Sequence, residues 1–162
     1  YSSAIKAIQL LNRFSFPVVI ITNQPAVARG WASEKNIMTI NQEIVRLLNR
    51  QGAYIHAVYS CPHHPQATLA KYRTACTCRK PGTQFFADAM GDLHMQTKKG
   101  YMIGDKTADI LAGTRAGLTT FLVQTGYKGQ DAVYKALPDY TCKNALTAAT
   151  IISSLHTQPE HQ

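Results

Sequence analysis

The chain has 162 residues, the length of one domain, and 45% of them are hydrophobic, so a sizeable core can be buried. Its 17 basic and 9 acidic residues give a net charge of +8, which favours anionic partners such as phosphorylated metabolites. No apolar run is long enough to cross a bilayer, no targeting segment is visible, and no basic run with interleaved aromatic residues indicates nucleic-acid binding. We therefore expect a cytoplasmic domain, monomeric or weakly self-associating, without a membrane or nucleic-acid partner.

Helical and strand patterns alternate along the first half of the chain. Residues 2–13 have the apolar spacing of a helix, and residues 17–21 form a short continuous apolar run, which is typical of a buried parallel strand. Ser33 can cap a helix over residues 34–50, and residues 54–59 have the pattern of the next strand. The helix over 34–50 is expected to turn these apolar residues inward: Ile37, Ile40, Ile44, Leu47 and Leu48.

The alternation continues after a long loop over residues 60–81. We predict a helix over 83–93, a strand over 100–103, a helix over 107–116, a strand over 119–123 and a helix over 143–155. This spacing argues for an α/β fold, a Rossmann-like parallel sheet with helices on both faces. Residues 1–155 are expected to form one domain, and residues 156–162 a flexible tail.

Polar residues follow three of the predicted strands, at the point where each strand ends. Thr22 and Asn23 come after the first strand, Lys80 closes the loop after the second, and Asp105 follows the third. In parallel sheets the ligand site lies at the carboxyl ends of the strands. We therefore expect these side chains to meet at one edge of the sheet.

The loop after the second strand carries four soft metal ligands at two close spacings. Cys61-x-His63 and Cys76-x-Cys78 suit a tetrahedral structural zinc ion. His64 is an alternative to His63, which we prefer because Cys-x-His then mirrors Cys-x-Cys. A disulfide from Cys61 to either later cysteine is the other interpretation, and the lack of a secretory signal disfavours it.

Three of these features together resemble the haloacid dehalogenase superfamily of phosphotransferases. Thr22-Asn23 resembles its second motif, in which a hydroxyl binds the transferred phosphoryl group, and Lys80 resembles the cation of its third. Gly104-Asp105-x-x-x-Asp109 resembles its fourth motif, whose first acid helps to hold Mg²⁺. The resemblance implies that a metal and fixed cations neutralise the charge on the phosphate oxygens.

Longer segments narrow the resemblance to the D-glycero-D-manno-heptose 1,7-bisphosphate 7-phosphatases. The segments are residues 22–30, 61–65, 76–81 and 104–106, and the resemblance extends over about residues 1–155. It implies that Arg79 and Lys80 contact the substrate, beside a structural zinc. It also implies that Asn23 positions substrate or nucleophile, that Arg29 binds the rest of the sugar phosphate, and that Lys106 lies in the shell of the metal site.

Two related families share parts of this pattern. Histidinol-phosphate phosphatases have the zinc loop but usually lack Ala28-Arg29-Gly30, and polynucleotide 3′-phosphatases have a similar Arg-Gly run without the cysteine loop. The two motifs together favour the heptose enzyme, and histidinol-phosphate phosphatase remains the alternative. One departure is Gly82-Thr83-Gln84, where the heptose family has x-Pro-Gly after its Cys-Arg-Lys-Pro.

The superfamily's first motif, Asp-x-Asp-Gly-Thr, is absent from these 162 residues. Its first acid is the nucleophile that becomes an aspartyl phosphate, and its second is the general acid and base. Either the chain is a fragment that begins at Tyr1 after the first strand, which we favour, or it is a natural variant without a nucleophile. In both cases we expect the chain alone to be inactive, with a strand missing from its sheet. A non-catalytic polyanion-binding module is the competing hypothesis.

Overall fold

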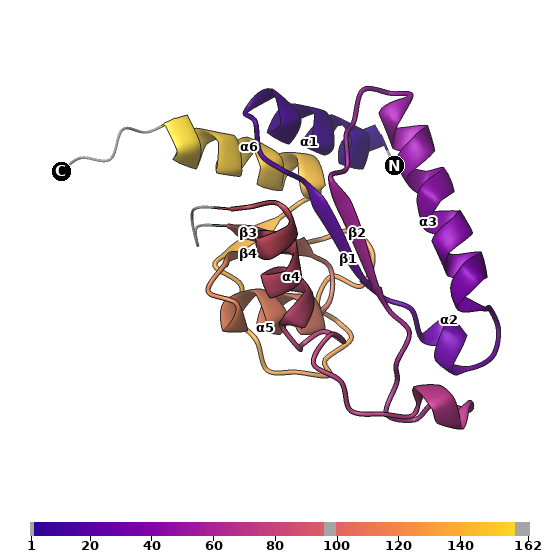
Figure 1. The fold of residues 1–162 in the computed structure, drawn as a ribbon. Coiled ribbons are helices and arrows are strands. Elements are labelled where there is room, and N and C mark those ends of the chain that lie inside the picture. Colours follow the sequence, from indigo (N-terminus) through magenta and orange to yellow (C-terminus); the bar gives the residue numbers. More distant parts are fainter. Residues whose placement is uncertain (1, 96–99, 158–162) are drawn as a thin grey trace.

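A computed structural model describes residues 2–95 and 100–157 of the chain (Figure 1). The helices are α1 (Ser2–Arg13), α2 (Pro25–Ala28), α3 (Glu34–Asn49), α4 (Gln84–Asp92), α5 (Thr107–Arg115), α6 (Ala145–Thr157) and the 3-10 helix η1 (Ala70–Tyr72). The strands are β1 (Val19–Asn23), β2 (Ala57–Cys61), β3 (Tyr101–Gly104), β4 (Thr119–Val123) and β5 (Tyr140–Cys142).

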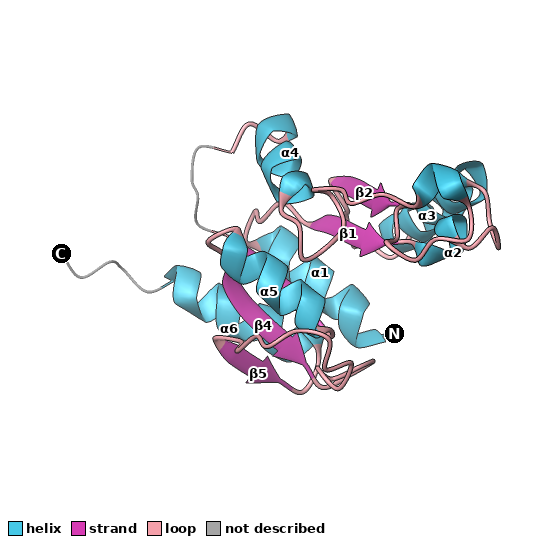
Figure 2. Ribbon diagram, turned by 90° about the horizontal axis from the view of Figure 1, so that it is seen from below, coloured by secondary structure: helices cyan, strands magenta, loops and turns pink. Residues whose placement is uncertain are grey.

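Within the described residues the strands form two parallel sheets. β1 pairs with β2 so that their last residues, Asn23 and Cys61, lie opposite each other. β4 lies between β3 and β5, with Phe121 opposite Ile103 on one side and Tyr140 on the other. The arrowheads of β1, β2, β4 and β5 all point toward the same side of the molecule (Figure 2). These strands confirm the predicted α/β class with parallel pairing.

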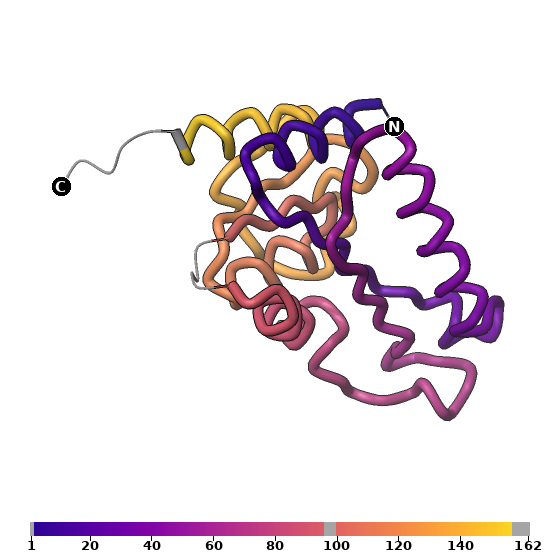
Figure 3. Tube along the Cα trace, turned by 45° about the horizontal axis from the view of Figure 1, so that its top comes forward, coloured from indigo at the N-terminus to yellow at the C-terminus, as the bar shows by residue number. Residues whose placement is uncertain are grey.

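Helices cover both faces of the three-stranded sheet, as predicted. Phe121 and Val123 of β4 belong to a core with Leu11 of α1 and Ile152 of α6. Figures 1 and 3 show α1 and α6 side by side on this face. On the other face Met102 of β3 packs with residues of α4 and α5. Successive strand residues point to opposite faces, so short apolar strands supply both cores.

An apolar cavity of about 420 Å³ separates the two sheets. Val19 and Ile21 of β1 line one side, and Tyr101 and Ile103 of β3 line the other. Among the described residues, β1 pairs only with β2, and β3 only with β4. An unpaired edge presents a row of backbone N–H and C=O groups that can pair with another strand. The expected gap in the sheet therefore lies between β1 and β3.

The apolar face predicted for α3 is only partly buried. Ile37 is buried and Leu48 half-buried, but Ile40, Ile44 and Leu47 are 51%, 42% and 47% exposed, so the prediction is wrong for these three. α3 lies at the side of the molecule beside β2 (Figures 1 and 3). A sheet of two short strands is too narrow to cover the whole apolar stripe of a long helix.

Smaller differences concern the ends of elements. β1 runs to Asn23, so Thr22 and Asn23 end the strand rather than follow it. α6 extends through the predicted start of the tail, and the His156 ring lies 4.8 Å from the Phe16 ring, centroid to centroid. Residues 158–162 of the predicted tail lie outside the described residues. Of the helices in the described ranges, none has the length and apolar character of a membrane span.

The carboxylate of Asp139 is hydrogen-bonded to the buried centre of β4, and a substitution can test what these bonds contribute to stability. Its Oδ2 accepts hydrogen bonds from the Thr120 N–H at 2.7 Å and the Thr120 O–H at 2.8 Å, and Thr120 is fully buried. We expect Asp139→Ala to lower the free energy of unfolding by about 1–3 kcal/mol, because both donors lose their acceptor. Urea denaturation at pH 7 measures this change, and Glu43→Ala on the exposed face of α3 is the control.

The loss of stability caused by Asp139→Ala should depend on pH. The hydrogen bonds from the backbone and hydroxyl of Thr120 lower the pKa of Asp139. A lowered pKa means that the carboxylate stabilises the fold above its unfolded pKa of about 3.9, and that this stabilisation is lost as pH falls through the folded pKa. The difference between wild type and Asp139→Ala should therefore shrink on acidification. An unchanged difference between pH 7 and pH 3 would contradict this account.

Candidate functional site

The predicted polar residues come together at the carboxyl ends of the strands. Thr22 and Asn23 are the last residues of β1, Cys61 is the last of β2, and Asp105 directly follows β3. Because the paired strands are parallel, their ends present these side chains along one edge. The loop after β2 brings Lys80 to the same edge, as its contacts show.

Lys80 is a buried cation held between the two sheets. Its side chain is 9% exposed, and its Nζ lies 2.8 Å from Asp109 Oδ1. The same Nζ donates to the backbone carbonyl of Ile21 in β1 at 2.5 Å. An ammonium group has three N–H donors, so one remains for a further acceptor. These contacts fix the position of the Lys80 ammonium, whereas the ammonium of an exposed lysine moves freely.

Asn23 fixes the backbone of Lys80. Its Nδ2 donates to the Lys80 carbonyl at 3.0 Å, and its Oδ1 accepts from the Lys80 N–H at 3.0 Å. These two hydrogen bonds join the end of β1 to the loop that carries Lys80. The Thr22 hydroxyl accepts from the Gln24 amide at 3.4 Å, and its own O–H can donate to an anion.

Asp109, in the first turn of α5, orients the residues around it. It is 6% exposed, and its Oδ2 accepts from the backbone N–H groups of Asp105 at 3.2 Å and Lys106 at 3.0 Å. A Cβ at Gly104 would lie 2.3 Å from the Asp109 Cβ, so the close approach requires glycine there. The i, i+4 spacing of the two acids was visible in the sequence, but the ion pair of Asp109 with Lys80 was not.

Asp105 and Lys106 both contact the turn that follows β4. Asp105 Oδ2 accepts from the Tyr127 N–H at 2.8 Å, and the Lys106 ammonium lies 4.0 Å from the centroid of the Tyr127 ring. Sequence reasoning missed Tyr127, which stands far from the motif residues in the chain. The glycines at 126 and 129 were the available signal, since they indicate a turn with unusual backbone angles.

The two predicted substrate-binding arginines lie on the loops beside the strand ends. Arg79 donates to the His63 carbonyl at 2.9 Å, which fixes it to the cysteine loop. The Arg29 guanidinium carbon lies 4.8 Å from the centroid of the Trp31 ring. Burial, and the nearby charges of Arg79 and Arg29, lower the pKa of His64. The two arginines therefore create a region of positive potential around His64.

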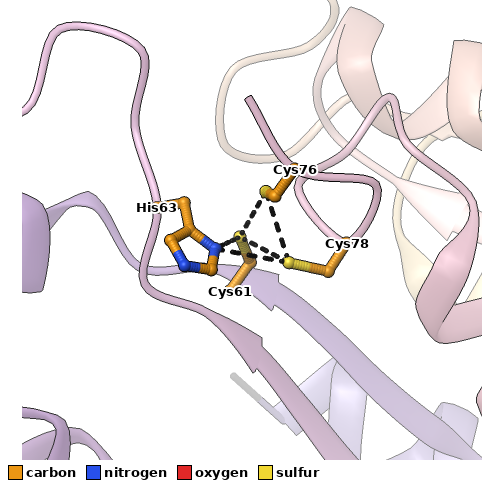
Figure 4. A group of neighbouring side chains, drawn as sticks. All are labelled: Cys61, His63, Cys76 and Cys78. Carbon is orange, nitrogen blue, oxygen red and sulfur yellow. Dashed lines mark hydrogen bonds between the residues drawn. The ribbon is translucent and has the colours of Figure 1, made fainter. Parts of the chain in front are cut away.

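Four side chains from the end of β2 and from the loop that follows it form a compact cluster, with a ligand atom of each within 4.8 Å of the others (Figure 4). They are Cys61, His63, Cys76 and Cys78. The sulfur atoms lie 3.2–3.6 Å apart, and His63 Nδ1 lies 3.6 Å from the sulfur of Cys78. His64 Nδ1 instead accepts from the Gln66 N–H at 3.0 Å. Of the two histidines, the structure therefore places His63 in the cluster.

The geometry and chemistry of this cluster fit a zinc ion. With zinc–sulfur bonds of about 2.3 Å, a tetrahedral site places its sulfur atoms about 3.8 Å apart, slightly farther than the sulfur atoms here. Burial raises the pKa of the Cys61 thiol, whereas hydrogen bonds from the Arg79 backbone and Cys78, acting against burial, lower that of Cys76. A bound cation would offset the cost of a buried thiolate. All the cysteines in the described residues are free thiols.

Comparison with known proteins gives a consistent set of relatives. A family model described as HAD-hydrolase-like matches residues 77–149. D-glycero-beta-D-manno-heptose-1,7-bisphosphate 7-phosphatase of Escherichia coli O6:H1 is 36% identical over 123 residues, which are 75% of this chain and 65% of that protein. The protein of the same name from Rhodopseudomonas palustris is 38% identical over 125 residues, which are 77% of this chain and 67% of that protein.

Solved structures show the same similarity in three dimensions. The D,D-heptose 1,7-bisphosphate phosphatase of B. bronchiseptica, complexed with magnesium and phosphate, superimposes with a TM-score of 0.80 at 26% identity. The match covers 96% of this chain and 84% of that structure. A putative HAD-like phosphatase from Mesorhizobium loti, with a TM-score of 0.79 and 24% identity over 100% of this chain and 77% of that one, shares the fold.

Cys78→Ala tests the cysteine cluster as a zinc site. We expect zinc content to fall from about one ion per chain to nearly none, and the melting temperature to fall with it, because the site contributes to folding when the metal is bound. Cys142→Ala is the matched control, since Cys142 is buried in the core between β5 and α6 and outside the cluster. Elemental analysis and thermal unfolding measure both quantities. Full zinc content and stability in Cys78→Ala would exclude Cys78 as a ligand.

Proposed function

Since the chain belongs to the HAD-like hydrolases, in the group of the heptose bisphosphate phosphatases, we propose that it forms the catalytic core of an enzyme that hydrolyses D-glycero-D-manno-heptose 1,7-bisphosphate to the 1-phosphate. The observation that carries this proposal is the buried ammonium of Lys80, fixed by Asp109 and by the carbonyl of Ile21. A fixed cation at the ends of parallel strands suits the charge of a transferred phosphoryl group.

The residues of this chain divide into two groups according to the part of the substrate they would bind. The third N–H of Lys80 and the O–H of Thr22 would hold the phosphoryl group that is transferred. Arg79 and Arg29 would bind the second phosphate of the sugar, because both are cations on loops beside the strand ends. The zinc ion would only order the loop, since four protein ligands leave no open position for a water molecule.

Asp105 fits a magnesium site. Mg²⁺ prefers oxygen ligands and usually takes one or two carboxylates together with substrate phosphates and water. Asp105 accepts the Tyr127 N–H on Oδ2, so Oδ1 can serve as such a ligand. When bound, the ion would neutralise charge on the phosphate oxygens. The magnesium and phosphate in the B. bronchiseptica relative support this assignment.

The nucleophile would come from an additional strand, which would occupy the cavity between β1 and β3. No Asp-x-Asp occurs in the 162 residues, and the cavity has apolar walls with Lys80 among its lining residues. A parallel strand placed there would bring two acids at its carboxyl end close to Lys80. One carboxylate would bond to phosphorus as the bond to the sugar oxygen breaks, and the other would protonate that oxygen. Water would then release the phosphate from the first acid.

A non-catalytic role is the second candidate function. Two observations favour it: the 162 residues contain no Asp-x-Asp, and their net charge is +8. A domain of this kind would bind a sugar phosphate or another polyanion through Lys80, Arg79 and Arg29 without hydrolysing it. For either function we propose a cytoplasmic protein, because free thiols persist in a reducing compartment. We also propose that it is monomeric or associates with itself only weakly.

Phosphate release is the direct test of the proposed activity. We expect the protein translated from the longest reading frame that encloses this chain to release phosphate from the heptose bisphosphate when Mg²⁺ is present. Residues 1–162 alone should release none, because the nucleophile is absent. Histidinol phosphate is the comparison substrate. Rapid turnover by 1–162 would refute the need for an added strand, and tight binding without turnover by the longer protein would favour the non-catalytic role.

Arg79→Ala tests the proposed contact with the second phosphate. In the active protein we expect KM for the bisphosphate to rise about 10- to 100-fold with little change in kcat, because a charged hydrogen bond to a non-reacting group is lost. Arg46→Ala on the exposed surface of α3 removes the same charge far from the strand ends and should change neither constant. Steady-state kinetics at fixed ionic strength compare the two. An unchanged KM in Arg79→Ala would exclude the contact.

A further inference from the structure

The turn after β4, residues 124–130, holds Asp105 by both its side chain and its backbone. The Tyr127 N–H donates to Asp105 Oδ2 at 2.8 Å, and the Gly129 N–H donates to the Asp105 carbonyl at 2.8 Å. The Gln130 N–H donates to the Tyr127 carbonyl at 2.8 Å and closes the turn on itself. The carboxylate of Asp105 is thereby fixed by a segment that is distant in the sequence and belongs to none of the recognised motifs.

Gly126 makes this contact sterically feasible. A Cβ at this position would lie 2.2 Å from Asp105 Oδ2 and 3.0 Å from its Cγ. Heavy atoms cannot approach so closely, so any side chain at 126 would displace the carboxylate. Gly126 also has a φ of +67°, which favours glycine for a separate reason. Gly117 has a φ of +73° with nothing within 4 Å of its Cβ position, so it shares the backbone requirement without the contact.

The hydrogen bond to Oδ2 has a consequence for metal binding. With one oxygen engaged by the Tyr127 N–H, Asp105 offers Oδ1 as a single ligand atom. Single carboxylate oxygens suit the small octahedral Mg²⁺ ion, whereas the larger Ca²⁺ ion also accepts both oxygens of one carboxylate. The Tyr127 ring meanwhile carries the Lys106 ammonium at 4.0 Å from its centroid, which keeps that cation beside the same site.

We propose that Gly126 and Tyr127 are positioning residues, which hold the Asp105 carboxylate in a one-oxygen arrangement that favours Mg²⁺ over Ca²⁺. This inference rests on the proposed magnesium site at Asp105 and adds to it the part of the chain that sets the geometry of that site. Hydrogen-bonded residues behind a metal ligand commonly change metal affinity by about 10- to 100-fold.

The test uses residues 1–162 labelled with ¹⁵N and Mn²⁺ as a paramagnetic probe of the magnesium site. In the wild type we expect Mn²⁺ to broaden the amide signals of Gly104 and Asp105, and Mg²⁺ to reverse the broadening at a lower concentration than Ca²⁺. Gly126→Ala should need about tenfold more Mn²⁺ and lose the preference for Mg²⁺. Gly117→Ala should keep the Mn²⁺ response and the preference for Mg²⁺, even if its melting temperature is as low as that of Gly126→Ala.

Hydrogen exchange of the Tyr127 amide supplies a readout that does not depend on a metal or on the folding of a variant. A protected amide in the wild type supports the contact, and a freely exchanging one overturns the proposal. Equal Mn²⁺ response in Gly126→Ala and wild type also overturns it, while leaving the phosphatase proposal intact. Mn²⁺ binding elsewhere in the wild type would refute the magnesium site itself. Loss of phosphate release in the longer protein with the expected Mn²⁺ results would instead refute only the function.

Discussion

The ion pair between Lys80 and Asp109 is the contact on which the rest of the site depends. Lys80 belongs to the loop after β2, Asp109 to the helix after β3, and the Lys80 ammonium also binds β1. It therefore links the two sheets across the edge of an apolar cavity. Two buried charges of opposite sign are tolerated where either alone would be costly, by about 3–5 kcal/mol when one partner is removed. The position of the cation and the relative position of the two sheets are thus determined together.

Residues of the same type near this ion pair differ in burial and in hydrogen bonding, and therefore in role. Of the two acids after β3, Asp109 is buried, orients backbone N–H groups and neutralises Lys80, whereas Asp105 accepts a hydrogen bond from the Tyr127 N–H on Oδ2. Of the two adjacent cations, Lys80 is buried, while Arg79 is fixed to the cysteine cluster through the His63 carbonyl. Burial and hydrogen bonding separate these roles, which residue identity alone does not distinguish.

Features that depend on local patterns were predictable from the sequence. The strand over 119–123 and the helix over 2–13 have their predicted bounds, because continuous apolar runs and helical spacing are local signals. The inward face of α3 was predicted wrongly, since periodicity does not tell how wide a sheet the helix meets. The bonds of Asn23 to Lys80 and of Tyr127 to Asp105 join residues far apart in the chain, and no spacing rule reveals such pairs.

The packing of α1 against α6 also determines when the domain can fold during synthesis. α1 is made at the beginning of these 162 residues and α6 near their end, yet they share one core with β4. Contacts between such distant segments form slowly, because most of the intervening chain must first be ordered. As the polypeptide leaves the ribosome, the apolar side of α1 therefore stays exposed until α6 has been made. A nascent chain of this kind offers a binding surface to chaperones until α6 has emerged.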